Sequence, residues 1–121
     1  MREIEGNFFP EIITRLPEAD IPIQGLHSYL LQGENQQIVF MSFEKDAEVN
    51  EHSHEAQWGV IIDGEIELTV DGKTRVLGRG DTYFIPGGVG HSAHAKKGYK
   101  DITLFDQVDR YPIKQKNPNG T

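Results

Sequence analysis

The chain has 121 residues, no cysteine, and a formal net charge of −7 from 19 acidic and 12 basic residues. This length fits one domain, and the lack of cysteine excludes disulfides and thiolate metal ligands. The sequence has no basic stripe for nucleic-acid binding, no apolar run near the ~20 residues of a membrane-spanning helix, and no secretory signal. We therefore expect one cytoplasmic domain over residues 1–121, with neither a nucleic acid nor a membrane as partner.

Glycines and prolines are spread along the chain as turns between short strand-like segments. Residues 1–22 contain three prolines and predict an irregular lead-in or a wrapping edge segment. Strands are predicted at 25–31, 37–43, 48–54, 58–62, 65–70, 73–77, 82–85, 91–95 and 101–108. Asp71-Gly72 fits a two-residue hairpin turn with positive φ. The pattern indicates an all-β sandwich or barrel with its core at about 23–110 and a loose tail at 112–121.

Two of the five histidines, His52 and His54, form an i, i+2 pair in a predicted strand. Side chains two residues apart on a strand point to the same face, so both imidazoles can reach one metal ion. Gln57 at the start of the next strand offers an amide oxygen, and His91 opens a later strand after a glycine-rich turn. A pair of solvated surface histidines is the structural alternative to a metal site.

The order of these residues resembles the two sequence motifs of the cupin family. The first motif, G-x5-H-x-H-x3,4-E-x6-G, is approached by His52, His54, Gln57 and Asp63-Gly64-Glu65. The second motif, G-x5-P-x-G-x2-H-x3-N, is matched through its histidine by Gly80, Pro86, Gly88 and His91. Three positions depart from the motifs: Ala47 replaces the opening glycine, Gln57 replaces the glutamate one residue early, and Ala95 replaces the final asparagine. The resemblance covers about residues 36–108.

A small cupin is expected to be a double-stranded β-helix, or jelly-roll barrel, of two antiparallel sheets. The resemblance implies one divalent ion (Zn, Ni, Mn, Fe or Cu) held by His52, His54, Gln57 and His91. Because glutamine is neutral, this ligand set carries no charge, so the ion would bind less tightly and act as a stronger Lewis acid. The lack of an anionic ligand also disfavours a higher oxidation state. We take this as favouring acid–base or isomerisation chemistry over oxygen activation.

The chain also resembles the uronate-linearising cupins, which place a glutamine in the metal shell. This implies an enzyme acting on a small sugar acid or carbonyl metabolite by isomerisation, ring opening or lyase chemistry. The C-terminal strand of those enzymes carries an Asp, a Phe and an Arg that act on the sugar. Here Phe105 fits, Thr103 stands in place of the Asp, and Arg110 is displaced by one position. Further candidates for a general acid or base are Tyr83, Asp101 and Asp106.

Two other functions stay open at this point. One is a dioxygenase of the quercetinase or thiol-oxidising kind, and the other is a non-catalytic sensor that binds a small metabolite. In each case the ligand is expected inside the barrel, and small inward residues near the motifs, Gly59, Ala93 and Ala95, would leave room for it. Family analogy also implies a homodimer, with the proline-rich start as a candidate for a swapped edge strand.

Three side chains near the motifs are expected to lie outside the site. His94 follows His91 by three residues and should point to the opposite face of its strand. His27 has no motif around it, so packing in the core or on the surface is the default. Trp58 alternates away from Gln57 and is predicted to pack between the sheets.

Overall fold

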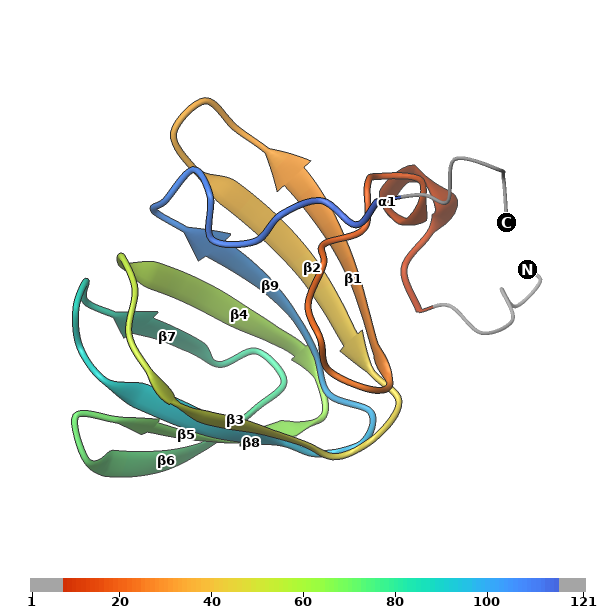
Figure 1. The fold of residues 1–121 in the computed structure, drawn as a ribbon. Helices are drawn as coiled ribbons and strands as arrows, with labels where there is room; N and C mark the ends of the chain where they lie inside the picture. Colours follow the sequence, from red (N-terminus) through yellow and green to blue (C-terminus); the bar gives the residue numbers. More distant parts are fainter. Residues whose placement is uncertain (1–7, 116–121) are drawn as a thin grey trace.

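A computed structural model describes residues 8–115 of the chain as two antiparallel sheets facing each other (Figure 1). The five-stranded sheet has the order β1 (Leu26–Gln32), β2 (Gln37–Phe43), β9 (Lys100–Phe105), β4 (Gln57–Asp63), β7 (Thr82–Ile85). The four-stranded sheet has the order β3 (Ala47–His52), β8 (His91–Ala95), β5 (Glu65–Val70), β6 (Lys73–Gly78). The prediction of an all-β jelly-roll of two antiparallel sheets is confirmed.

The strand ends differ from the predicted ones at two places that matter for the site. The segment predicted to run to His54 ends at His52, after a register shift in the pairing of β3 with β8. The segment predicted to run to Val108 ends at Phe105, where the amide of Asp106 leaves the ladder and donates to the carbonyl of Ala56 at 2.9 Å. His54 therefore lies in a loop, and its direction is set by that loop and not by strand alternation.

The predicted turn between β5 and β6 has the expected backbone. Asp71 has φ 51° and Gly72 has φ 78°, so both central residues lie in the left-handed region that a two-residue hairpin requires. This tight turn sets the pairing of β5 with β6, in which Val70 is opposite Lys73.

The described part of the lead-in, residues 8–22, wraps onto the five-stranded sheet. It contains one short helix, α1 (Glu11–Thr14), which the sequence did not predict. Glu18 then forms a bridge to Tyr29 of β1, and Ala19 forms one to Ile113. The start of the tail is therefore paired with the lead-in and is not loose as expected, while residues 116–121 lie outside the described part.

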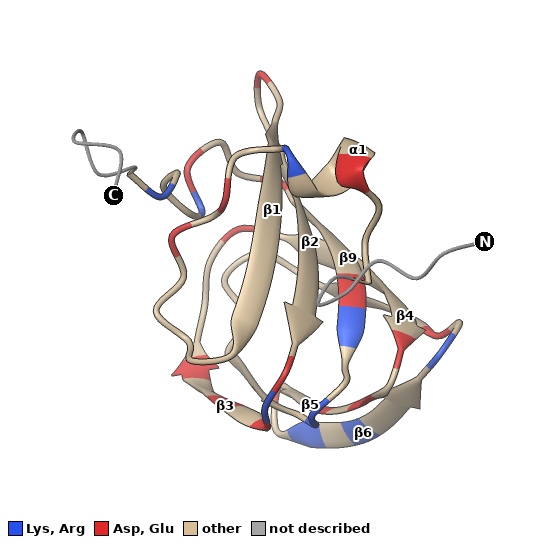
Figure 2. Cartoon of the chain, turned by 90° about the vertical axis from the view of Figure 1, so that its right-hand side faces the viewer, with Lys and Arg blue, Asp and Glu red and all other residues tan. Residues whose placement is uncertain are grey.

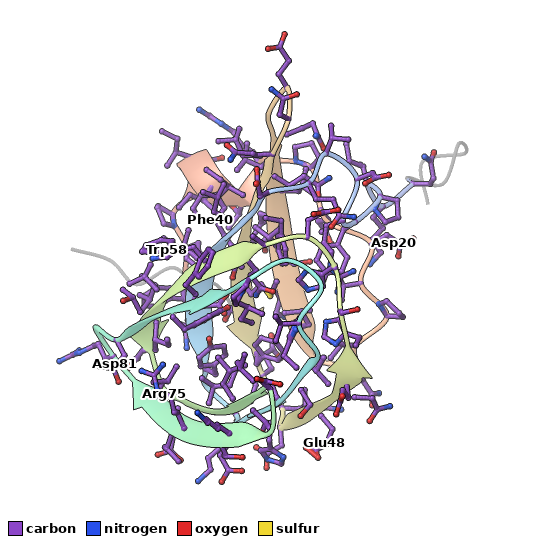
Figure 3. All side chains as sticks on the ribbon, turned by 90° about the vertical axis from the view of Figure 1, so that its left-hand side faces the viewer. Asp20, Phe40, Glu48, Trp58, Arg75 and Asp81 are labelled. Carbon is purple, nitrogen blue, oxygen red and sulfur yellow. The ribbon has the colours of Figure 1, made fainter. Side chains whose placement is uncertain are left out.

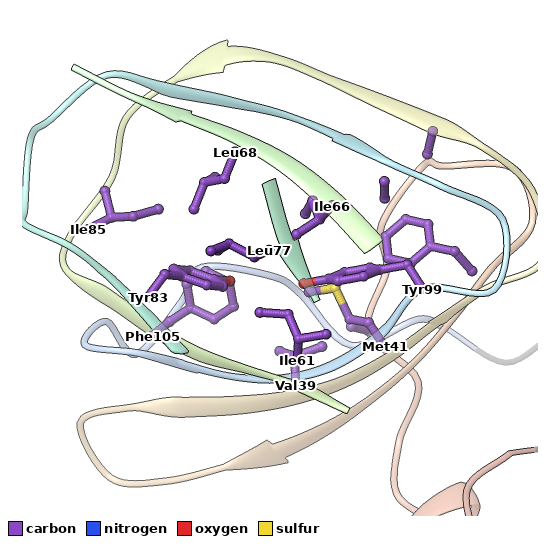
Figure 4. Close-up of a cluster of buried hydrophobic side chains, with 14 of the residues drawn as sticks. Val39, Met41, Ile61, Ile66, Leu68, Leu77, Tyr83, Ile85, Tyr99 and Phe105 are labelled. Carbon is purple, nitrogen blue, oxygen red and sulfur yellow. The ribbon is translucent and has the colours of Figure 1, made fainter. Parts of the chain in front are cut away.

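The core lies between the two sheets, where apolar side chains from both layers meet (Figure 4). Val39 and Ile61 come from the five-stranded sheet, and Leu68 and Leu77 come from the four-stranded sheet; each is at most 5% exposed. Charged residues are absent from β1 and β2 and gather on the strands and turns of the four-stranded sheet (Figure 2).

Polarity on β9 is reversed relative to an ordinary core strand. Its inward residues are Asp101, Thr103 and Phe105, at 4%, 0% and 2% exposure, whereas Ile102 and Leu104 face outward and are only partly covered. Period-two alternation alone would place the apolar pair inside. The sheet thus turns polar groups toward the interior at the strand that carries part of the candidate site.

On β4 the small and polar residues Gly59 and Gln57 likewise face inward, and this corrects the expectation for Trp58. This side chain is 41% exposed on the outer face of the sheet and does not pack between the sheets. It lies on the same side of the molecule as Phe40 (Figure 3).

Among residues 8–115, no helix has the length and apolar character needed to cross a membrane.

Candidate metal centre

Three histidines from two segments of chain meet at one end of the barrel. His52, the last residue of β3, is the direct cross-strand partner of His91, the first residue of β8. His54 lies two residues beyond β3, and its carbonyl accepts the amide of Gly88 at 2.8 Å. Gly88 has φ 80°, a backbone conformation suited to glycine. The glycine-rich turn before β8 therefore holds the His54 loop beside His91.

The imidazole nitrogens converge closely enough for one ion. One ring nitrogen from each of the three residues lies within 4.8 Å of the other two. The Nε2 atoms of His54 and His91 are 3.1 Å apart. Two nitrogens bound to the same Zn²⁺ at ~2.0–2.1 Å with octahedral to tetrahedral angles are separated by about 2.8–3.4 Å, so the observed spacing fits a shared metal ion.

Hydrogen bonds on the far side of each ring fix which nitrogen faces the centre. Each Nδ1 lies within hydrogen-bond distance of a backbone carbonyl: His52 of Asn50 at 2.9 Å, His54 of Glu55 at 2.7 Å, and His91 of Val89 at 3.0 Å. A carbonyl only accepts, so each Nδ1 must carry the proton and donate it. Each Nε2 then keeps its lone pair, which is the state that a metal ligand needs, with an outer partner that orients the ring.

The electrostatics of the centre also favour neutral imidazoles. Burial, with smaller contributions from the nearby Arg110, His91 and His52, lowers the pKa of His54 to about 4 against the opposing hydrogen bond to Glu55. Burial likewise lowers the pKa of His91, with smaller contributions from His52 and Arg110. Since metal binding requires deprotonated imidazole, these surroundings prepare the rings of His54 and His91 for an ion near neutral pH.

Gln57 opens β4 and lines the same cavity as the three histidines. Its Nε2 donates a hydrogen bond to the Tyr83 hydroxyl at 2.9 Å, which leaves Oε1 as the free acceptor of the amide. Tyr83 reaches this position because its ring lies over Gly59, where a Cβ would come within 2.5 Å of the ring. The donor set offered to an ion is thus three neutral imidazoles and one amide oxygen, which suits a divalent transition metal.

The cavity below this centre has a volume of about 90 Å³ and is open to solvent on one side. Four of the residues expected to leave room or take part in chemistry line it: Ala93, Ala95, Tyr83 and Phe105. The Phe105 ring lies 5.5 Å from the His54 ring in an edge-to-face arrangement. Burial raises the pKa of Tyr83 above its ordinary value, so this phenol stays protonated and acts only as a hydrogen-bonding group near neutral pH.

The two other candidates in the C-terminal segment, Arg110 and Asp106, lie in different surroundings. Arg110 lines the cavity, with its guanidinium 4.2 Å from the ring centre of Tyr111 and 5.7 Å from that of Phe105. Asp106 is exposed, accepts a hydrogen bond from Gln36 at 3.1 Å, and does not belong to the cavity wall.

Asp101, one of three acid–base candidates from the sequence, is the carboxylate among the described cavity residues. It is 4% exposed, and its Oδ2 accepts a hydrogen bond from the Tyr99 hydroxyl at 2.6 Å. Burial raises its pKa to about 7, although the hydrogen bond from Tyr99 and the nearby Thr103 oppose the rise. The only signal in the sequence was its place on the polar face of an otherwise apolar strand.

The remaining histidines lie outside the cavity. His94 is on the outer face of the four-stranded sheet, where its Nδ1 is 2.6 Å from the carboxylate of Glu48. The expectation that it faces away from His91 is confirmed. His27 contacts Glu44 at the surface.

Comparison with known proteins gives a consistent family assignment. An RmlC-like cupin from Shewanella frigidimarina NCIMB 400 is 30% identical over 91% of this chain and 97% of its own, with a TM-score of 0.71. KdgF from Halomonas sp. is 25% identical over 77% of this chain and 89% of its own, with a TM-score of 0.66. A mutant of Bacillus subtilis oxalate decarboxylase is 25% identical, and the match covers 76% of this chain but 28% of that one, with a TM-score of 0.63.

No curated protein matches the sequence. The sequence profile described as "Cupin domain" matches residues 39–104, which is more than half of the chain and contains all three converging histidines. Together with the two-sheet fold and the structural relatives, this match shows that the chain belongs to the cupin family.

Proposed function

We propose that this cupin is a metal-dependent enzyme that acts on a small sugar acid or carbonyl metabolite by isomerisation, ring opening or lyase chemistry. The observation that carries the proposal is the set of three neutral imidazoles whose Nε2 atoms converge above a cavity. Their outer nitrogens are bonded to backbone carbonyls, as in sites that hold a metal ion.

His52, His54, His91 and the amide oxygen of Gln57 would hold the ion. When bound there, a divalent ion supplies Lewis-acid polarisation of a carbonyl or carboxylate oxygen. Gln57 is kept in place for this role by its hydrogen bond to Tyr83. Binding of oxygen is not needed for this chemistry, and the uncharged ligand set disfavours a higher oxidation state of the ion.

Two other side chains have matching roles in the proposal. Arg110 is a fixed cation at the histidine end of the cavity and would bind and orient the anionic end of the substrate. Asp101 can take up and return a proton near neutral pH, because its pKa is raised to about 7. Phe105 and the aliphatic wall would exclude water from the cavity between Arg110 and Asp101.

The proposed substrate class is broad and most of its members lack a chromophore, so turnover is followed by a method that needs none. The protein loaded in turn with Zn²⁺, Mn²⁺, Ni²⁺ and Fe²⁺ is incubated with two- to six-carbon hydroxy, keto and sugar acids, including unsaturated uronates, and proton NMR reports any product. We expect turnover that disappears in His91→Ala. Oxygen uptake in step with product would contradict the proposal and support a dioxygenase, and binding without turnover by any metal form would support a sensor.

We further propose that two copies associate through the outer face of the five-stranded sheet. Trp58 and Phe84 are register partners on β4 and β7, and they are 41% and 61% exposed. An apolar sheet face of this kind commonly marks an interface, and a stable dimer buries roughly 800 Å² on each partner. Light scattering should give a dimer for the parent protein and a monomer for Trp58→Glu with Phe84→Glu.

Val76→Glu is the matched control for this experiment, because Val76 is 60% exposed on β6 in the other sheet. The control should remain dimeric. A monomeric parent protein at high concentration, or loss of the dimer only in the control, would contradict this interface.

A further inference from the structure

Three buried side-chain polar atoms in the described part of the chain make no hydrogen bond of normal geometry: Asp101 Oδ1, Thr103 Oγ1 and Arg110 Nε. Thr103 nevertheless lies close enough to Asp101 and Tyr83 to lower the pKa of each. Native proteins pair almost all such atoms, because an unpaired buried polar group costs stability. The three exceptions are not scattered, since all three residues line the same cavity. Their clustering indicates that the missing partners belong to something that enters this space.

The three atoms lie at two ends of the cavity. On β9, Phe105 is paired with Gln57 at the histidine end, whereas Asp101 is paired with Ile61 deeper in the barrel. A strand rises about 3.4 Å per residue, so Thr103 and Asp101 are about 7 and 14 Å along the strand from Phe105. Arg110 is at the histidine end, because its guanidinium lies 5.7 Å from the Phe105 ring centre.

The inner end is a compact polar group inside an apolar wall. The hydroxyls of Tyr83 and Tyr99 point toward one another across the interior (Figure 4). Tyr99 donates its proton to Asp101 Oδ2, so Oδ1 is left as the acceptor. Thr103, which is completely buried, adds a hydroxyl that can donate or accept a hydrogen bond.

The unpaired atoms define complementary chemistry for the two ends of a ligand. Arg110 Nε is a cationic donor beside the histidines, and it calls for an anionic acceptor such as a carboxylate. In the ionised carboxylate, Asp101 Oδ1 calls for a donor, and Thr103 Oγ1 can accept or donate a hydrogen bond. A hydroxyl is the small group that can donate to Asp101 and also pair with Thr103.

The size of the space limits the length of such a ligand. A cavity of 150 Å³ accommodates the six carbons of benzene, so the 90 Å³ here, which is open to solvent on one side, holds about three or four heavy atoms. A carboxylate at the mouth, beside Arg110, adds three more. The fit is a chain of about four carbons, which is shorter than a hexuronate.

We propose that Asp101 and Thr103 form a recognition subsite for the terminal hydroxyl of a short hydroxycarboxylate whose carboxylate lies beside Arg110 and the three histidines. This inference rests on the proposed function in using the same cavity, and it narrows the substrate class. It concerns binding alone, so it is tested without turnover.

The direct test is calorimetric titration of the Zn²⁺-loaded protein with 4-hydroxybutyrate and with butyrate, which differ only in the terminal hydroxyl. We expect 4-hydroxybutyrate to bind at least about tenfold more tightly, because a site built to bond a hydroxyl discriminates against the ligand that lacks it. Thr103→Val and Asp101→Asn should each reduce this ratio to below about threefold. Arg110→Gln should weaken both ligands by similar factors and leave the ratio unchanged.

Thr69→Val is the matched control, because Thr69 is hydrogen-bonded to Thr74 in the four-stranded sheet, at 2.7 Å, and does not line this cavity. It should retain the full ratio. Equal affinities in the parent protein, or a ratio that Thr103→Val does not change, would overturn the proposal and assign the unpaired atoms to an ordered water. If Asp101→Asn fails to fold, Thr103→Val, which keeps the side-chain shape, decides the question.

The outcomes also separate this inference from the proposed function. Discrimination in favour of the hydroxyl, with no turnover of any acid in any metal form, would leave the subsite standing and remove the enzyme. Turnover of sugar acids that does not depend on Thr103 would leave the proposed enzyme standing and remove the subsite.

Discussion

At the histidine end of the cavity, each of the three rings is paired on its outer side and open on its inner side, whereas at the inner end two buried oxygens make no hydrogen bond of normal geometry. The three Nδ1 atoms are bonded to backbone carbonyls, so ring direction and tautomer are fixed before any ion arrives. Asp101 and Thr103 keep one unpaired oxygen each. Rigid support suits a metal ion, which demands fixed geometry, and unmet bonding capacity suits a ligand that comes and goes.

Removing one ring is the strongest way to break the histidine end. His91→Ala should lower metal affinity by more than about 100-fold, which is the upper range for losing even an outer-shell partner. Metal content after dialysis, measured by mass spectrometry, checks this. His94→Ala is the control, since His94 lies on the same strand but outside the barrel; equal metal loss in both variants would remove the site assignment.

The raised pKa of Asp101 at the inner end of the cavity should make the free energy of unfolding depend on pH. The pKa of Asp101 is raised to about 7 in the folded protein, above the ~3.9 of an unfolded chain. The folded state therefore holds more protons between these values, and the free energy of unfolding falls as pH rises. We expect this carboxyl to contribute a loss of about 2 kcal/mol between pH 5 and pH 7. The lowered pKa of His54 contributes a gain over the same range, so the Asp101 contribution is the difference between the parent protein and Asp101→Asn in their metal-free forms.

Urea denaturation at several pH values measures this loss. Asp101→Asn should remove the part of the pH dependence that belongs to this carboxyl. A pH profile identical in the variant and the parent protein would show that Asp101 is not perturbed as described.

The ligand role of Gln57 can be sharpened by giving the histidine end a charge. Gln57→Glu should tighten metal binding by about tenfold, because a carboxylate attracts a divalent ion more strongly than an amide does. Competition with a chelator gives the affinity. Unchanged or weaker binding would contradict coordination through residue 57.

The smallest effect concerns stability at the inner end. Thr103→Val replaces a buried, unpaired hydroxyl by a methyl group of similar shape, so the free energy of unfolding should rise by about 1 kcal/mol. Thermal denaturation of the ligand-free protein measures it. Higher stability together with lost discrimination between the two butyrates would show that the hydroxyl is kept for binding; lower stability would mean that Thr103 has a structural partner.

The fold was largely accessible from sequence because its signals are local. Alternation and turn residues located the strands, and Asp71-Gly72 has the backbone that its composition predicts. The spacing around His52, His54 and His91 was enough to suggest which rings would meet, but strand alternation explains only the direction of His52 and not that of His54. His54 lies beyond its strand, and it reaches His91 through a backbone bond to Gly88 in a distant turn.

Residues on the reversed strands were harder to predict. Trp58 was expected inside and lies outside, because β4 turns Gln57 and Gly59 inward. Asp101 and Asp106 had equal standing as acid–base candidates, but one is buried in the cavity and the other is at the surface. Hydrophobic alternation assigns apolar residues to the interior, and it fails where polar residues face inward, as Asp101 and Thr103 do on β9.

By itself the sequence determined the order of strands and turns, the resemblance to cupins, and the identity of the histidines that converge. These follow from spacing along one chain, since strand alternation and turn conformation depend on neighbours in sequence. Only the tertiary structure decided which atoms are paired. The open Nε2 lone pairs, the hydrogen bond between Gln57 and Tyr83, and the unpaired oxygens of Asp101 and Thr103 depend on contacts between segments far apart in the chain.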